Sequence, residues 1–224
     1  MITMNISRLR KYTCLLLLMT LLSWSCLGQS DERPFYFIEL DFNIVQAQDR
    51  FDELLEDKGL NTFELLLLRQ FNKQDAWFAG ASFTLVNYDE LSQGFETIKS
   101  GYYDLSAVVR HYPDIGWWRL DPYIQGLAGI RTFKTNTFIE ISEETTEQEN
   151  NHRDTSLLFG AGIGVTLMIV EQAHLNLGAQ YLYGGATTYL LDNGADVFPL
   201  IDNFEEYFSI TNTIKYQIGA TFVF

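Results

Sequence analysis

The chain has 224 residues, enough for one domain of ordinary size, and its 15 basic and 29 acidic residues give a formal net charge of −14. This acidity argues against nucleic acid as a partner. After Gln29, no stretch approaches the ~18 consecutive apolar residues of a membrane-spanning helix, so composition alone would predict a soluble protein. The periodicity of the sequence argues otherwise.

The first 28 residues predict a secretory signal peptide. A basic segment at 8–11 precedes an apolar run, Leu15–Ser23, that is too short to cross a bilayer, and small residues follow at Cys26–Gly28. We expect cleavage before Gln29, so that 1–28 is removed and 29–224 forms one domain outside the cytoplasm.

Lipid attachment at Cys26 is the alternative to this cleavage. A lipoprotein signal prefers an aliphatic residue three places before its cysteine, and Ser23 stands there. Cleavage before Gln29 also removes both cysteines, so the mature chain would contain no thiol. It removes three bases and no acid, which leaves 12 − 29 = −17 as the net charge.

Eight segments of the mature chain alternate between apolar and polar residues with period two. Each is near or above the roughly 9–11 residues that a tilted strand needs to cross an outer membrane. The predicted strands are 34–46, 61–71, 76–87, 101–112, 122–142, 153–170, 172–184 and 210–224.

The two faces of these segments differ in chemistry. In the first segment the apolar face carries Tyr36, Ile38, Leu40, Phe42 and Ile44, and the other face carries Phe37, Glu39, Asp41 and Asn43. Glycine recurs on the polar face of the sixth, at Gly160, Gly162 and Gly164. Small inward residues suit a narrow closed barrel, in which every sheet edge is paired. The pattern predicts a barrel with its apolar face toward lipid.

Connection lengths alternate between short and long, as in membrane barrels. An even number of strands then places both termini at the short-turn, periplasmic end. Trp77, Trp117 and Trp118 lie beside the short turns, where an interfacial aromatic girdle belongs. Arg69 departs from the pattern because strict alternation points it toward lipid, so we expect a bulge there or a side chain that extends to the interface.

The last nine residues, YQIGATFVF, place Gln217, Gly219, Phe222 and Phe224 in a Q-x-G-x-x-F-x-F pattern. This resembles the C-terminal signal of bacterial outer-membrane barrels, and Pro122–Gly129 is similar to the fifth strand of the small barrels of the OmpA transmembrane, OmpX and opacity-protein type. The resemblance implies an all-β, eight-stranded antiparallel up-and-down transmembrane barrel in the outer membrane of a Gram-negative bacterium. It also implies that the barrel-assembly machinery reads Phe224 as an insertion signal.

Seven charged residues fall on inward positions. They are Glu39, Asp41, Glu64, Asp104, Arg110, Arg131 and Lys215. Ionised groups in a narrow lumen are costly unless they are paired, so we expect a network of interior ion pairs, with Lys215 beside Glu39 or Asp41. An ion-conducting pore is the alternative, although eight strands leave little room beyond side chains.

The four long connections (47–60, 88–100, 134–154 and 185–209) hold 19 acids against five bases. A solvated acidic surface is the simplest interpretation. The acids could also recruit Ca²⁺ or Mg²⁺ that bridges to lipopolysaccharide, in particular Glu140, Glu143, Glu144, Glu147 and Glu149 with Asp49, Asp52, Glu53, Glu56 and Asp57. Their spacing matches no defined calcium loop.

Apolar residues in these connections predict further structure. Segment 135–142 continues the strand alternation beyond what the membrane needs, and 197–208 is unusually apolar for an exterior loop. Both suggest either contact with a protein partner or packing of the loops on one another. Phe51, Leu54 and Leu55 before Gly59 suggest a short helical lid.

The only candidate for catalysis is His152, Asp154 and Ser156, which share one face of a strand. Residues two apart in a strand are separated by roughly 7 Å, too far for direct hydrogen bonds, so we predict no enzyme, cofactor or metal site. The sequence favours a structural, adhesive or partner-docking barrel, with a narrow pore and a lipid- or peptide-hydrolysing barrel as alternatives.

Overall fold

The computed structural model describes residues 35–55, 60–71, 76–113, 119–142, 145–194 and 199–224; the predicted signal peptide lies outside this part of the chain. The elements in chain order are β1 (Tyr36–Ala47), α2 (Asp49–Leu54), β2 (Leu60–Gln70), β3 (Trp77–Gln93), β4 (Glu96–His111), β5 (Leu120–Ser142), β6 (Thr145–Val170), β7 (Ala173–Gly184), β8 (Ala186–Asp192), η1 (Leu200–Asn203), β9 (Phe204–Ile210) and β10 (Thr213–Val223). Among the described residues, none of the helices is both long and apolar enough to cross a membrane.

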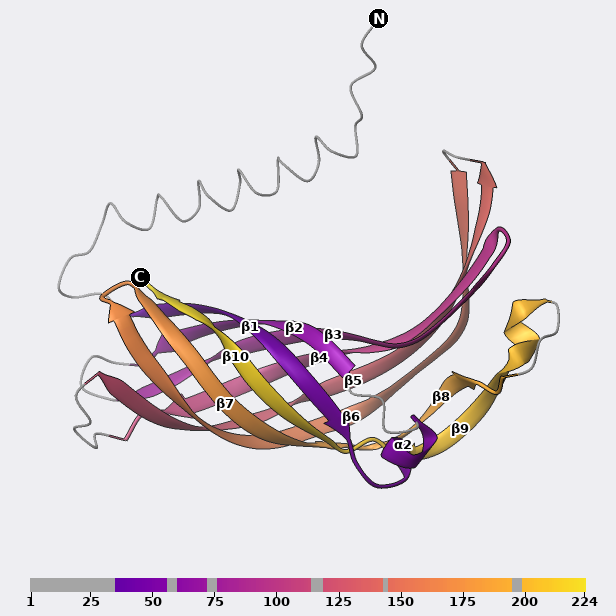
Figure 1. Cartoon of the computed structure of the whole chain (residues 1–224). Coiled ribbons are helices and arrows are strands. Elements are labelled where there is room, and N and C mark those ends of the chain that lie inside the picture. Colours follow the sequence, from indigo (N-terminus) through magenta and orange to yellow (C-terminus); the bar gives the residue numbers. More distant parts are fainter. Residues whose placement is uncertain (1–34, 56–59, 72–75, 114–118, 143–144, 195–198) are drawn as a thin grey trace, which may run out of the picture.

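Eight of these strands close into an antiparallel barrel in the order β1-β10-β7-β6-β5-β4-β3-β2 (Figure 1). The first and last strands complete it, in a register that runs from Phe37 opposite Val223 to Ala47 opposite Thr213. The main chains of Tyr36 and Phe224 exchange two hydrogen bonds of 2.9 and 3.0 Å at this seam. The predicted eight-stranded up-and-down barrel is confirmed.

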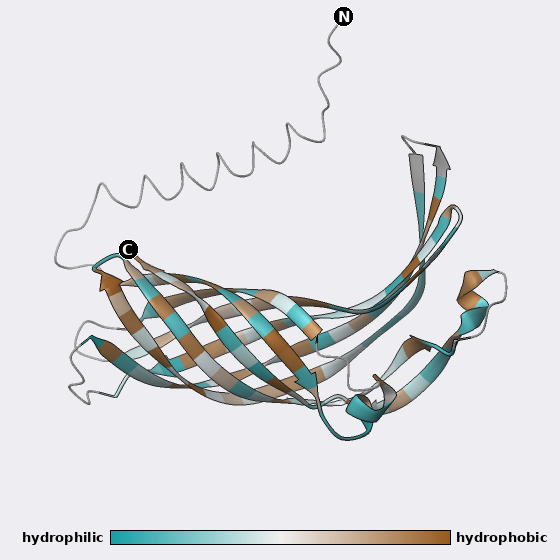
Figure 2. Cartoon of the chain, in the orientation of Figure 1, coloured by the Kyte–Doolittle hydropathy of each residue, from teal (hydrophilic) through white to brown (hydrophobic). Residues whose placement is uncertain are grey.

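The strands alternate between an exposed apolar face and a buried, largely polar face (Figure 2). Along β1, Leu40, Phe42 and Ile44 are exposed, whereas Glu39 and Asp41 are buried. Apolar residues on the outside and polar ones on the inside are the reverse of a soluble fold, and this is the arrangement that a lipid bilayer requires. Arg69 keeps the strict alternation: it is exposed on the outer face, with its guanidinium over the Tyr36 ring.

Two predicted loops are wrong, because strands continue through them. β3 and β4 pair as far as Gln93 and Glu96, where the prediction placed a link at 88–100. β6 begins at Thr145 rather than at 153, whereas the predicted end of the fifth strand at 142 agrees with β5. The strands continue because their main-chain N–H and C=O groups hydrogen-bond to one another there. The side chains also keep the two-residue alternation along most of these segments. We call this extension of β3–β6 the arm; it comprises residues 87–101, 134–142 and 145–153.

The link predicted at 185–209 instead contains the β8–β9 hairpin, and the last barrel strand begins at Thr213 rather than at 210. The break between β9 and β10 falls at Thr211 and Asn212. Thr211 N–H donates to the Gly184 carbonyl, and the Asn212 carbonyl accepts from Gln48 N–H, so these groups bind the neighbouring chain rather than a strand ladder. The predicted helix near residue 51 is present as α2.

Candidate functional site

The side chains inside the barrel form three layers along its axis. The layer nearest the two termini is apolar. At the end where the two termini meet, the Phe37 and Phe78 rings stack at 4.4 Å, and Tyr112 packs edge-on against Phe78 at 5.4 Å. Tyr123 contacts Tyr112 at 5.6 Å. The apolar cluster that contains these rings continues along the lumen toward the other end of the strands, where Leu182 lies opposite Thr213. Its buried aliphatic members are Leu66, Leu68, Val108, Leu127, Leu158 and Leu182. The rings themselves lie in the half of the lumen nearer the two termini.

The middle layer begins with Arg110 and Glu39, both completely buried. The Arg110 guanidinium donates two hydrogen bonds, of 2.8 and 2.9 Å, to the two oxygens of Glu39 and a third to Gln125. Asn176 and Thr221 donate to the same carboxylate. A buried ion pair is tolerated when it is bidentate and when other groups hydrogen-bond to its remaining lone pairs and protons. The Arg110–Glu39 pair meets both conditions.

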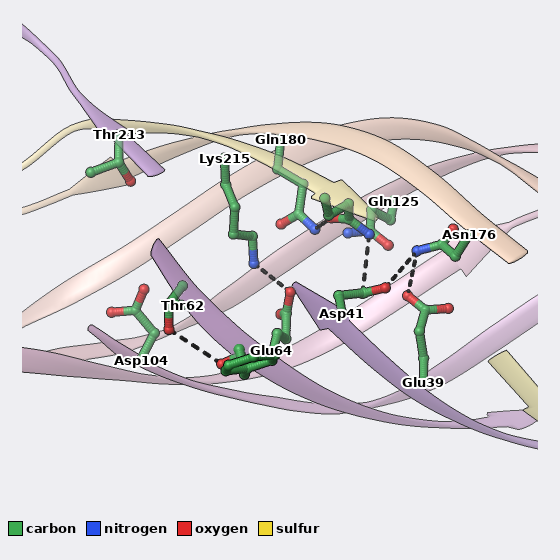
Figure 3. Close-up of polar contacts among 12 residues, drawn as sticks. Glu39, Asp41, Thr62, Glu64, Asp104, Gln125, Asn176, Gln180, Thr213 and Lys215 are labelled. Atoms are coloured by element: carbon green, nitrogen blue, oxygen red, sulfur yellow. Dashed lines mark hydrogen bonds and ion pairs between the residues drawn. The ribbon is translucent and has the colours of Figure 1, made fainter. Parts of the chain in front are cut away.

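Lys215 lies in the same layer but has a different partner from the predicted one. Its Nζ donates to Glu64 Oε2 at 2.6 Å rather than to Glu39 or Asp41 (Figure 3). Strand tilt explains the difference, because it brings Glu64, two strands away, to the level of Lys215. The Asp41 carboxylate accepts instead from Asn176 at 3.1 Å and from Gln217 at 3.4 Å.

Arg131 and Asp104 form the third ion pair, through two hydrogen bonds of 2.8 Å. Arg131 also donates to the Thr211 carbonyl at 2.6 Å, and its guanidinium lies 4.3 Å from the centre of the Tyr102 ring. The structure therefore places all seven predicted lumen residues inside the barrel and joins six of them in three ion pairs.

An aromatic layer, which the sequence pattern did not reveal, lies at the mouth opposite the two termini (Figure 1). Phe133 stacks on Tyr189 from β8 at 5.2 Å and lies 5.9 Å from Phe51 of α2. Tyr102 and Tyr88 contact the same ring at 5.1 and 6.0 Å. We call these five residues the aromatic cap. Tyr88, Tyr102 and Phe133 occupy inward positions of strands, so the sequence periodicity could have placed them in the lumen. The positions of Phe51 on α2 and Tyr189 on β8 depend on tertiary packing and could not be predicted this way.

The residues of the C-terminal motif have separate places in the folded barrel. Gln217 is buried in the lumen and donates to the Tyr123 hydroxyl at 3.1 Å. A Cβ on Gly219 would overlap the Leu40 carbonyl oxygen and the Asp41 carboxylate. Phe222 lies opposite Ile38, and Phe224 completes the seam. The structure thus gives Gln217, Gly219 and Phe224 a role in the closed barrel, and the insertion signal stays a prediction.

His152 and Asp154 bind the β8 strand. Asp154 Oδ2 accepts the Thr188 N–H at 2.8 Å and the Thr187 hydroxyl at 2.9 Å, while His152 Nε2 donates to the Thr188 carbonyl at 2.9 Å. The Thr188 N–H, followed by the Thr187 hydroxyl, lowers the pKa of Asp154 below its usual value. Ser156 is buried and accepts no hydrogen bond from either residue. These contacts fasten the β8–β9 hairpin to β6 and do not form a nucleophile–base pair.

The acidic connections remain largely exposed. Glu140, Glu147 and Glu149 are exposed on the arm, and Glu53 is exposed on α2. Within the described ranges, no group of three or more His, Cys, Asp or Glu side chains is arranged to hold a metal ion. Four of the acids considered for cation binding lie outside those ranges: Glu56, Asp57, Glu143 and Glu144. The same is true of Trp117 and Trp118, whereas Trp77 is exposed and stacks on His111 at 4.3 Å.

Comparison with known proteins decides the fold class. The sequence matches no protein-family model and no curated protein. The structure is similar to a major outer membrane protein from Thermus thermophilus, with a TM-score of 0.56 and 10% identity over 85% of this chain and 99% of that one. It is also similar to Neisserial surface protein A, with a TM-score of 0.52 and 13% identity over 84% and 96% of the two chains.

A third similar structure is Ail, the attachment invasion locus protein of Yersinia pestis, with a TM-score of 0.50 and 17% identity over 86% and 99% of the two chains. The chain has the fold of the small outer-membrane β-barrels. In such a barrel, the exposed apolar band is the lipid-facing wall. The arm, the aromatic cap and the β8–β9 hairpin then lie at the end opposite the two termini.

Proposed function

We propose that this small outer-membrane barrel is a closed anchor that holds a docking surface outside a Gram-negative cell. In this proposal the chain is exported through a cleaved signal peptide and inserted by the barrel-assembly machinery, which reads its last strand. The ion-paired lumen serves stability rather than transport.

The filled lumen is the observation that carries the proposal. An ion that crosses the barrel would have to pass the Phe37–Phe78 stack, three ion pairs and the aromatic cap. Breaking a buried ion pair costs about 3–5 kcal/mol, so a transient opening through this layer is rare. These contacts favour the anchor over the pore.

The docking surface would be the acidic outer end. Exposed carboxylates on α2, the arm and η1 suit a partner with a basic surface, and rim charges of this kind chiefly increase the association rate. Phe208 on β9 is 64% exposed and Ile210 is 44% exposed, so apolar contact area lies near these charges. Bridging of the same acids to lipopolysaccharide through divalent cations is the second candidate occupant.

Conductance tests the closed anchor. Purified protein in planar bilayers should give no steady current above the lipid background, and stepwise ion-selective currents would overturn the proposal. A photo-crosslinker at Glu149 on the arm should capture the partner in intact outer membrane. The matched position at Glu171, in the turn between β6 and β7, reports the periplasmic side and should not capture it.

A further inference from the structure

The arm does not continue along the barrel axis. Figure 1 shows that the β3–β4 and β5–β6 hairpins turn away from the long axis of the barrel once they leave it. The turn coincides with register shifts between Asn87 and Asp89 on β3 and between Thr135 and Asn136 on β5. Bulges of this kind bend a strand. When a strand bends away from the barrel axis, the face that was directed outward turns toward the membrane plane. The outer face of the arm is therefore directed toward the membrane surface.

That outer face continues the lipid-facing wall. The exposed residues Leu105, Ile130 and Leu157 lie side by side on β4, β5 and β6. Four residues further along β5 and β6, on the same face, Lys134 lies directly opposite Arg153. Four residues of extended strand span about 13 Å, so these two cations lie just beyond the last apolar row. Phosphate groups occupy this level of a bilayer.

Lys134 and Arg153 form a like-charge pair across the two strands, which is unfavourable by itself. Neither has an acidic ion-pair partner among the described residues; Arg153 donates only to the Tyr103 hydroxyl, at 3.1 Å. A third cation, Lys99, follows on the same face and pairs with Glu90 at 3.0 Å in an exposed position. The outer face thus has an excess of positive charge in a chain whose net charge is −14.

The opposite face of the arm is acidic. Glu149 and Glu147 pair across the strands with Thr137 and Ile139. Thr137 in turn lies beside Ile98, which is buried under the β8–β9 hairpin, so this face points away from the lipid-facing wall. The two faces of the arm therefore differ in charge: its three bases lie on the outer face together with Glu90 and Glu140, whereas the opposite face carries acids and no Lys or Arg.

We propose that the outer face of the arm binds the phosphate-bearing headgroups of the outer leaflet, through Lys134 and Arg153. An anion between these two side chains relieves their repulsion, and the Tyr103 hydroxyl adds a third donor at the same level. This inference rests on the membrane placement of the proposed function. It adds a lipid site on the face opposite the acidic surface and fixes the arm over the membrane.

Electron paramagnetic resonance on the full mature barrel in nanodiscs tests the site. A spin label on Asn136→Cys, on the same face as the two cations, reports its accessibility to a water-soluble relaxant. In discs that contain phosphatidylglycerol, accessibility should be roughly two-fold lower than in discs of phosphatidylcholine alone. The difference should disappear when salt is raised from ~0.05 M to ~1 M, because screening shortens the Debye length to about 3 Å. Inorganic phosphate added to neutral discs at matched ionic strength should not reproduce it.

Two charge variants make the result specific. Lys134→Gln/Arg153→Gln should remove the difference between the two lipids, and Glu147→Gln/Glu149→Gln, which changes two charges on the other face, should keep it. Loss in both variants would mean that net charge acts rather than the site, and an unchanged response in the first would overturn the inference. A barrel that inserts into discs but shows no lipid dependence refutes the headgroup site alone, whereas failure to insert refutes the proposed function.

Discussion

Arg110 on β4 and Glu39 on β1 are joined across the lumen by two parallel hydrogen bonds of 2.8 and 2.9 Å, although two strands separate them in the sheet. The pair therefore connects opposite parts of the barrel wall, which neighbouring strand ladders cannot do. Because both side chains are completely buried, neither can be hydrated if the other is removed. The stability of the barrel should depend on both residues together.

Arg110→Met should lower the free energy of unfolding by about 3–5 kcal/mol, because it leaves the Glu39 carboxylate buried and unpaired. Arg110→Met combined with Glu39→Leu should cost less than the sum of the single changes, since no isolated charge remains. Urea-induced unfolding in lipid vesicles measures these values. Arg50→Met, which removes an exposed arginine, is the control, and strictly additive losses would contradict the coupling.

The aromatic cap should behave as a separable layer. Phe51→Ala removes the ring by which α2 contacts Phe133 and Tyr189, at 5.9 and 5.2 Å. Amide hydrogen exchange in α2 should accelerate by at least an order of magnitude, because a short helix without its packed side chain is unstable in water. Conductance should stay at background, since the Arg131–Asp104 pair lies beneath the cap. Currents through the Phe51→Ala variant would show that the cap is the gate.

The attachment of β8 to β6 should weaken in acid. The folded-state pKa of Asp154 is lowered, mainly by the Thr188 N–H, so the carboxylate stabilises the attachment above its unfolded pKa of about 3.9 and loses this effect as the pH falls through the lower folded value. A spin label at Phe208 should therefore be equally ordered from about pH 5 to 8 and more mobile below about pH 4.

Two variants separate this carboxylate from general acid effects. Asp154→Ala should give the mobile spectrum at every pH in that range, whereas Glu149→Ala, which removes an exposed acid from the same strand, should keep the wild-type profile. A mobile wild-type hairpin at neutral pH would refute the role of Asp154.

The barrel could be predicted from sequence because its wall imposes the same two-residue alternation on every strand. Ile163 and Ala161 face out and Gly162 faces in, because successive side chains of a strand point to opposite faces. The partner of Lys215 could not be predicted this way, because it depends on how far the strands tilt and shift around the closed sheet. The alternation predicts that a side chain lies in the lumen, but it does not predict the position of that side chain along the barrel axis.

The β5 part of the arm was predicted as strand, but the β3–β4 part was predicted as a loop for a different reason. Segment 88–100 has Tyr88, Ile98 and Ser100 inward, but the bulge between Asn87 and Asp89 interrupts the two-residue alternation at its start. The bilayer sets a minimum length for a strand and no maximum. The hairpin β8–β9 and α2 depend on packing over the mouth, for which the sequence offers only scattered apolar residues such as Phe51.

We expect the last strand to serve both barrel closure and recognition during insertion, and a pair of variants can separate the two. Gly219→Ala should prevent closure in purified protein, because its Cβ would overlap the Leu40 carbonyl of the paired strand β1 and main-chain atoms cannot move aside. Gly126→Ala is the matched control: its Cβ would meet only the Gly160 carbonyl oxygen, at an ordinary 3.9 Å. Phe224→Ala should refold normally into vesicles, as judged by the mobility of unheated samples on gels, yet accumulate less in the outer membrane of cells. If Gly219→Ala refolds as well as Gly126→Ala, the glycine of the motif serves recognition rather than closure of the seam between β1 and β10.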